Sequence, residues 1–199
     1  VEDNVKFFCD LLGEVAEEKP DIVCLPECIT SIGVKDGHIA CARPIPGPET
    51  EALAAVAKKH RFMLGFTMME REGDLVYNAG VIIGKDGRLV GKYRKVHLAI
   101  LEGWSGVTPG KEFPVFDTEC GKIGMNICKD NSVLESCRVP ARAGMELLLM
   151  PIMGDHRAAA WRRGRPVFDE EKWKIIMRVR AIDNHIHMPV SYTHLTLPT

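Results

Sequence analysis

Residues 62–94 contain three apolar segments: Phe62-Met-Leu-Gly-Phe-Thr-Met-Met69, Leu75-Val-Tyr-Asn-Ala-Gly-Val-Ile-Ile83 and Leu89-Val-Gly-Lys-Tyr-Arg94. The polar run Glu70–Asp74 separates the first two segments, and the hairpin signal Asp86-Gly87 separates the last two. Apolar runs of this length, bounded by turn residues, are typical of β-strands. The segments therefore predict three neighbouring strands connected by hairpins.

Helical and extended patterns alternate on both sides of these hairpins. Near the N-terminus, apolar residues recur at helical spacing, and Asn4 is a candidate N-cap. Asp21–Pro26 is a short apolar run without alternation, which favours a buried strand. We also expect helices at about Glu49–His60, Ser132–Ala143 and Asp169–Ile182, and strands at Val115–Phe116, Lys122–Ile127 and Glu146–Met150. This order predicts a mixed α/β domain rather than a purely parallel one.

The composition is that of an ordinary globular domain. The length of 199 residues suits a single domain with its own hydrophobic core. Because 26 Lys and Arg residues nearly balance 27 Asp and Glu residues, the net charge of −1 gives no general attraction to nucleic acid or to an anionic membrane. No apolar run approaches the ~20 residues of a membrane-spanning helix, and no signal-peptide pattern is present. Seven cysteines are too sparse for a disulfide framework, so we expect a reducing, cytoplasmic location.

The two ends of the chain look incomplete. Val1 is not an initiator methionine, and the sequence opens directly in a helical pattern. Ser191–Thr199 resembles a translation of the transposase adapter that is used to prepare sequencing libraries. We therefore expect residues 1–188 to form a domain truncated at both ends. Residues 189–199 are expected to be an adapter-derived tail, exposed and with few contacts to the domain.

Three residues that could take part in catalysis directly follow predicted strands: Glu27, Lys95 and Cys128. The functional crevice of an α/β sheet lies at the carboxyl ends of its strands, so these side chains could converge there. Together they would supply a proton carrier, a fixed positive charge and a nucleophile. We expect a helix N-terminus and the neighbouring Lys129 to stabilise the thiolate of Cys128.

The motifs around these residues resemble the nitrilase, or carbon–nitrogen hydrolase, superfamily. Leu25-Pro-Glu27 is similar to its glutamate motif, Lys92–Leu98 to its lysine motif and Ile127–Asp130 to its cysteine motif. Further matching motifs occur in the expected order: Ile45–Pro48, Tyr77-Asn78, Thr108–Gly110 and Arg180–Asn184. Asn131 and Ser132 depart from the arginine pair found in branches that cleave N-carbamoyl D-amino acids.

The resemblance implies a four-layer α-β-β-α sandwich with a catalytic triad of Glu27, Lys95 and Cys128. Glu102 is the counterpart of a second active-site glutamate. The resemblance further implies a thiol hydrolase that needs no metal or organic cofactor. Its substrates would be small amides or N-carbamoyl compounds, which are favoured over nitriles. We expect the complete protein to be a homo-oligomer.

The basic segment 156–165 suggests how the substrate could be selected. Arginine side chains suit carboxylates, so Arg157 or Arg162 could bind an acidic substrate. The same segment could instead be a solvated loop or an oligomer contact. Two other functions stay open: a non-catalytic scaffold on the same fold, and a thiol-redox or metal protein that uses Cys24 and Cys28.

Overall fold

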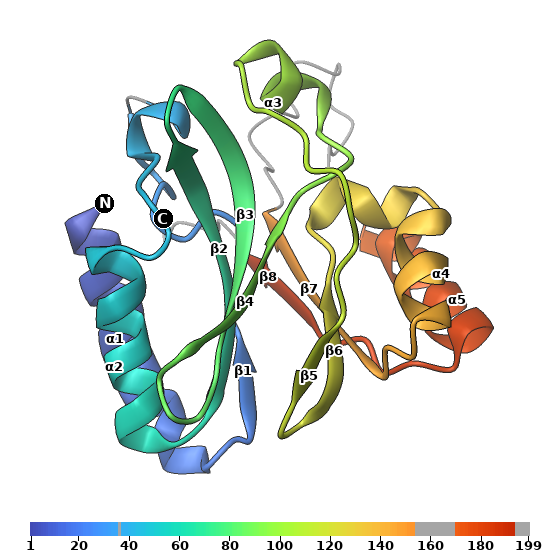
Figure 1. Cartoon of the computed structure of the whole chain (residues 1–199), viewed down its shortest axis with the longest axis horizontal. Helices are drawn as coiled ribbons and strands as arrows, with labels where there is room; N and C mark the ends of the chain where they lie inside the picture. The colour runs from blue at the N-terminus through green and yellow to red at the C-terminus, as the bar shows by residue number, and fades with distance from the viewer. Residues whose placement is uncertain (36, 154–169, 194–199) are drawn as a thin grey trace.

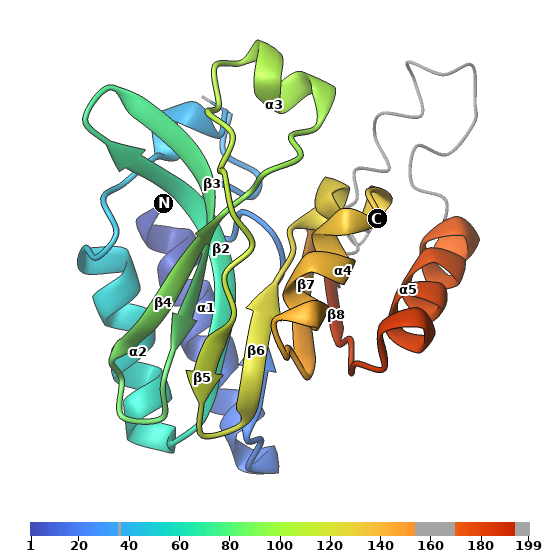
Figure 2. The same ribbon diagram turned by 45° about the vertical axis from the view of Figure 1, so that its right-hand side comes forward.

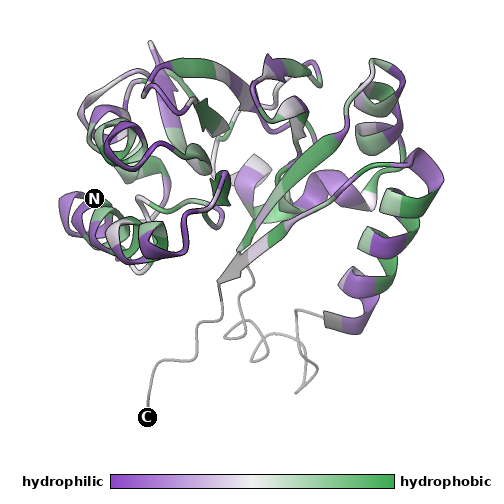
Figure 3. Cartoon of the chain, turned by 90° about the horizontal axis from the view of Figure 1, so that it is seen from below, coloured by the Kyte–Doolittle hydropathy of each residue, from purple (hydrophilic) through white to green (hydrophobic). Residues whose placement is uncertain are grey.

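The structure, a computed structural model, describes residues 1–35, 37–153 and 170–193 and consists of four layers (Figure 1). Two β-sheets face each other in the middle, with helices covering the outer face of each sheet (Figure 2). The predicted α-β-β-α sandwich is therefore confirmed. Figure 3 shows hydrophobic residues concentrated on the strands, between helices that carry both hydrophilic and hydrophobic residues.

The first sheet has the strand order β1-β2-β3-β4, formed by Ile22–Cys24, Met63–Glu72, Leu75–Ile83 and Leu89–Arg94. β1 pairs with β2 in parallel, and β2, β3 and β4 form the two predicted antiparallel hairpins. The helices α1 (Glu2–Val15) and α2 (Pro48–His60) pack on this sheet. Their contacts form a large core that includes Phe8, Leu12, Leu53, Ala57, Phe62, Leu64 and Phe66.

The second sheet has the strand order β5-β6-β7-β8, formed by Phe116–Thr118, Gly121–Met125, Leu147–Met153 and Val190–Thr193. β5 and β6 are antiparallel, whereas β6, β7 and β8 are parallel. α4 (Glu135–Arg142) and α5 (Glu170–Asn184) cover its outer face (Figure 2). The described residues also contain short helical segments at Ala16–Glu18 (η1), Ile39–Cys41 (η2), Ile100–Trp104 (α3) and Cys128–Ser132 (η3).

Glycines of the first sheet allow the two sheets to pack closely. A Cβ added at Gly65 would lie 2.4 Å from Cδ1 of Leu149, and one added at Gly80 would lie 2.2 Å from Sδ of Met125. Met125 and Leu149 are buried in the core between the sheets. The large side chains of the second sheet therefore occupy space that the first sheet leaves free.

Some sequence-based boundaries differ from the structure. Asn4 lies inside α1, where its side-chain amide donates a hydrogen bond to the carbonyl of Ile32, so the expected N-cap is wrong. β2 continues through the polar residues to Glu72, because pairing with β3 satisfies the backbone there. The helix expected at Ser132–Ala143 begins later, at Glu135, after the turn η3.

The segment expected to be a detached tail pairs with the domain over residues 190–193. These residues form β8, whose register joins Met150 to Val190 and Ile152 to Tyr192. Backbone hydrogen bonds do not depend on side-chain identity, so pairing alone does not identify what encoded this segment. The expectation of few contacts fails for β8, and residues 194–199 lie outside the described residues. The boundary between residues 1–188 and 189–199 stays a prediction.

None of the helices that the structure describes is both long enough and apolar enough to cross a membrane.

Replacing Gly80 by alanine tests the close packing of the two sheets. Gly80→Ala should lower the free energy of unfolding by about 1–3 kcal/mol, because the new methyl group overlaps the buried Met125 side chain. Gly13→Ala is the matched control, since Gly13 lies inside α1 and a Cβ there meets no atom within 4 Å. It should stabilise the protein by about 0.5–1 kcal/mol. Urea denaturation measures both, and equal stabilities of the two variants would contradict the packing account.

Candidate active site

The residues Glu27, Lys95 and Cys128 come together in the structure, each just beyond the carboxyl end of a different strand. Glu27 follows β1 and Lys95 follows β4, while Cys128 follows β6 of the facing sheet. Glu27 and Lys95 are only 4% and 2% exposed, and Cys128 is half-buried. The ammonium of Lys95 lies 2.8 Å from Oε1 of Glu27. The site is therefore a buried charged cluster to which both sheets contribute.

Glu102 belongs to the same cluster. Its Oε2 atom lies 2.7 Å from Nζ of Lys95 and accepts a 2.7 Å hydrogen bond from the backbone N–H of Ala99. Glu102 lies on α3, the short helix in the connection after β4. Burial alone would lower the pKa of Lys95, but the charges of Glu27 and Glu102 outweigh it and raise the pKa above its usual value. Lys95 therefore carries a permanent positive charge.

Cys128 lies in an unusual backbone conformation. Its φ of +43° places a residue with a side chain in the left-handed region, which non-glycine residues seldom adopt. Burial raises the pKa of the thiol well above its usual value, and the negative charge of Glu27 raises it further. The expectation of a stabilised thiolate is therefore wrong: η3 is a single short turn, the Lys129 side chain is exposed, and the resting thiol keeps its proton.

The carboxylate of Asp130 joins the cysteine segment to the lysine segment. Its Oδ2 accepts hydrogen bonds from the Tyr93 hydroxyl at 2.7 Å and the Ile127 N–H at 2.9 Å. Its Oδ1 accepts the N–H of His97 at 2.8 Å. Asp130 is completely buried, so these three donors replace the water that it loses on folding. The positions of Lys95 and Cys128 therefore depend on a shared carboxylate between them.

Two further partners orient Glu27. Its Oε2 accepts the backbone N–H of Met153, at the end of β7, at 2.9 Å. Its Oε1 accepts the side-chain amide of Asn78 at 2.9 Å as well as Lys95. In the sequence, Asn78 matches the family only as part of the Tyr77-Asn78 motif, with no role assigned to it. The available signal was an amide in the middle of the apolar strand 75–83, because a buried polar side chain requires partners.

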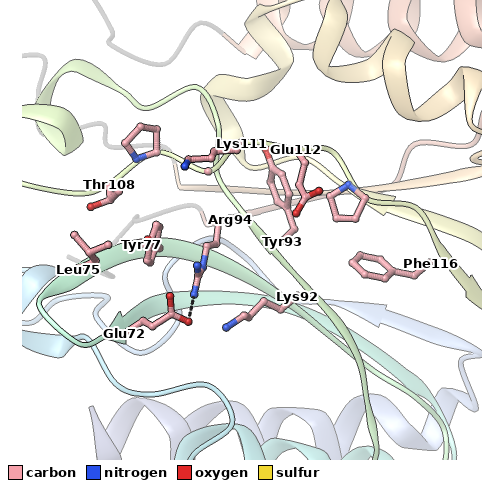
Figure 4. Close-up of a pocket in the computed structure, with 13 residues that line it drawn as sticks. Glu72, Leu75, Tyr77, Lys92, Tyr93, Arg94, Thr108, Lys111, Glu112 and Phe116 are labelled. Carbon is pink, nitrogen blue, oxygen red and sulfur yellow. Dashed lines mark hydrogen bonds and ion pairs between the residues drawn. The ribbon is translucent and has the colours of Figure 1, made fainter.

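The large cleft in Figure 4 does not coincide with this cluster. It has a volume of about 670 Å³ and is lined by Glu72 at the end of β2 and by residues of β3, β4 and the 108–116 segment. There Arg94 stacks over the Tyr77 ring at 3.9 Å and pairs with Glu72 at 2.6 Å. None of Glu27, Lys95 and Cys128 is among the residues that line it. The candidate active site is therefore assigned from the reactive side chains that it brings together, and not from the volume of a cleft.

Other predicted site residues lie away from this cluster or outside the described residues. Arg157 and Arg162 fall in residues 154–169, which lie outside the described residues. Cys24 and Cys28 are free thiols, and burial raises the pKa of Cys24 to about 12. Among the residues that the structure describes, no group of three or more His, Cys, Asp or Glu side chains is arranged to hold a metal ion.

A family model matches almost the whole chain. The family model "Carbon-nitrogen hydrolase" matches residues 1–193. The chain belongs to the carbon–nitrogen hydrolase family. Omega-amidase NIT2 from Homo sapiens is 31% identical over 195 residues, which cover 94% of this chain and 67% of the relative. Omega-amidase NIT2-B from Xenopus laevis is 32% identical with the same coverage.

Solved structures share the fold of this carbon–nitrogen hydrolase. Nit3 of Saccharomyces cerevisiae, a member of branch 10 of that superfamily, matches with a TM-score of 0.82 and 26% identity, covering 100% of this chain and 72% of Nit3. The NitFhit protein of C. elegans matches with a TM-score of 0.80 and 25% identity, covering 100% of this chain and 49% of NitFhit. The predicted family, fold and enzyme class are therefore confirmed.

Removing the Asp130 carboxylate tests its structural role. Asp130→Ala should lower the free energy of unfolding by about 2–4 kcal/mol, because it leaves the Ile127 and His97 N–H groups buried without an acceptor. Asp117→Ala is the control, since the Asp117 side chain is 86% exposed. Its effect should stay within about 0.5 kcal/mol. Denaturant melts of the two variants would contradict this account if their midpoints were equal.

Proposed function

We propose that the protein is a thiol hydrolase that cleaves the C–N bond of small-molecule amides through a thioester on Cys128. The observation that carries the proposal is the buried cluster in which Glu27, Lys95 and Glu102 lie beside a cysteine held at positive φ. Such a cluster combines a nucleophile, a proton acceptor and a fixed cation in one place.

Acylation begins with proton transfer. Because the resting thiol is protonated, Glu27 takes its proton as the sulfur attacks the amide carbon. The C=O electron pair moves onto oxygen and gives a tetrahedral oxyanion. When this species collapses, the C–N bond breaks, Glu27 returns the proton to nitrogen, and ammonia or an amine leaves. The product on the enzyme is a thioester of Cys128.

Lys95 is suited to stabilise the oxyanion. An ammonium has three N–H donors, and contacts with Glu27 and Glu102 use two of them. The third N–H donor can bind the substrate oxygen. The backbone N–H of Lys129 is proposed as a second donor to the same oxygen. Donors of this kind contribute roughly 3–4 kcal/mol each to stabilising the transition state. Since both glutamates fix the ammonium, little reorganisation is needed as the charge develops.

Deacylation repeats the same roles with water. Glu27 takes a proton from the attacking water, which adds to the thioester carbon. Collapse breaks the C–S bond, and Glu27 returns the proton to the sulfur. The products are a carboxylic acid and the restored thiol. Each step uses only this chain's residues, the amide and water.

The substrate class is narrowed by the relatives. Proteins named omega-amidases are 31–32% identical over 94% of this chain, so an ω-amide, which carries a carboxylate at its other end, is the first candidate. Binding of that carboxylate by Arg157 or Arg162 stays a prediction. A homo-oligomer also stays a prediction. The apolar side chains Ile175 and Ile182, which are exposed on α5, would offer a contact surface for it.

Replacing the nucleophile tests the proposed reaction. Cys128→Ala should abolish ammonia release from ω-amides and simple amides, a loss of at least about 10⁴-fold, because no other group can form the thioester. Circular dichroism and thermal melting should show that the fold is retained.

Two other cysteines provide controls of matched chemistry. Cys41 and Cys137 are also free thiols, more deeply buried than Cys128. Cys41→Ala and Cys137→Ala remove the same atoms and should retain activity within about tenfold, after correction for any folding loss. Substantial turnover by Cys128→Ala would refute the proposed mechanism.

A further inference from the structure

Asn78 contacts all three charged residues of the candidate active site. It lies on β3, and its side chain is completely buried. Its Nδ2 donates hydrogen bonds to Oε1 of Glu27 at 2.9 Å and to Oε1 of Glu102 at 2.8 Å. Its backbone carbonyl accepts the N–H of Lys95 at 2.9 Å. One residue thus links the general base, the second glutamate and the segment that carries the cation.

The chemistry of these contacts requires an amide. An amide NH₂ group has two hydrogens, and here each one meets a different carboxylate. An aspartate in the same place would bring a third negative charge against two, and an aliphatic side chain would offer no donor. Within the part of the chain that the structure describes, Oδ1 of Asn78 is buried without a hydrogen-bond partner. The two hydrogen bonds of the Nδ2 atom are therefore made although the Oδ1 atom of the same amide has no partner among the described residues.

The same contacts position α3. No residue of this helix is buried, and Ile100, Leu101 and Trp104 are 70–82% exposed, so packing holds it weakly. Glu102 connects the helix to the site through Asn78 and Lys95, while its Oε2 also accepts the Ala99 N–H that begins the helix. The position of α3 above the site therefore depends on a carboxylate that Asn78 orients.

We propose that Asn78 is a positioning residue for the reaction, which holds Glu27 and Glu102 in the correct orientation around Lys95. This inference deepens the proposed function and rests on it. Two carboxylates that share one site repel each other, and an N–H donor to each of them offsets this repulsion and fixes the direction of the accepting oxygen. Asn78 supplies one donor to each, from the rigid middle of a paired strand.

Two substitutions of similar size test the proposal. Asn78→Leu removes both donors, and Asn78→Asp replaces them with a negative charge. Both should lower kcat for amide hydrolysis by at least about tenfold with a much smaller change in KM, because orientation of the base acts on the chemical step.

Asn126→Leu is the matched control. Asn126 is equally buried, donates hydrogen bonds to Oδ1 of Asn131 and the carbonyl of Ser136, and likewise has an Oδ1 without a partner among the described residues. Its substitution removes as many hydrogen bonds without touching Glu27 or Glu102. Its kcat for amide hydrolysis should therefore fall much less than that of the two Asn78 variants.

The rate of Cys128 alkylation by iodoacetamide gives a second measurement that needs no turnover. This rate should fall in both Asn78 variants and stay close to that of the unsubstituted protein in Asn126→Leu, because a misplaced Glu27 takes the thiol proton less readily. If the unsubstituted protein releases no ammonia, the proposed function fails, and alkylation alone decides the role of Asn78. A fall in kcat no larger than that of Asn126→Leu, or an unchanged alkylation rate in both Asn78 variants, would overturn the positioning role.

Discussion

The buried ammonium of Lys95 is the constraint on which the site depends. A charge removed from water costs several kcal/mol unless partners surround it, and Lys95 is only 2% exposed. Glu27 and Glu102 supply the opposite charge at 2.8 Å and 2.7 Å. Glu27 follows β1, whereas Glu102 lies on α3. The chain must therefore bring distant segments together for Lys95 to be buried at all. The ion cluster is thus a condition of folding as well as an arrangement for chemistry.

The second sheet contributes the nucleophile, and its placement depends on Asp130. Close packing of the sheets brings β6 against the first sheet, and the Asp130 carboxylate then joins Ile127 to Tyr93 and His97. This connection sets Cys128 beside Glu27, where burial and negative charge keep the thiol protonated. A protonated nucleophile beside a carboxylate explains why the proposed reaction needs a general base rather than a stabilised thiolate.

Much of the fold and site could be predicted from local sequence. The hairpins of residues 62–94 carry turn signals, and Glu27, Lys95 and Cys128 each follow an apolar run. α3 could not be predicted this way, because its apolar side chains are exposed and a carboxylate holds it. The protonation state of Cys128 and the bonds of Asn78 arise from residues distant in sequence. Pairing of β8 was missed because backbone hydrogen bonding needs no side-chain pattern.

The most direct test of the account is to trap the acyl group on the enzyme. An ω-amide substrate is mixed with the purified protein, the reaction is stopped with acid within milliseconds, and tryptic peptides are examined by mass spectrometry. The account predicts that peptide 123–129, which contains Cys128, gains the mass of the acyl group, and that Glu27→Gln prevents this gain. Steady ammonia release with an acyl group on another cysteine, or on none of the seven, would contradict it.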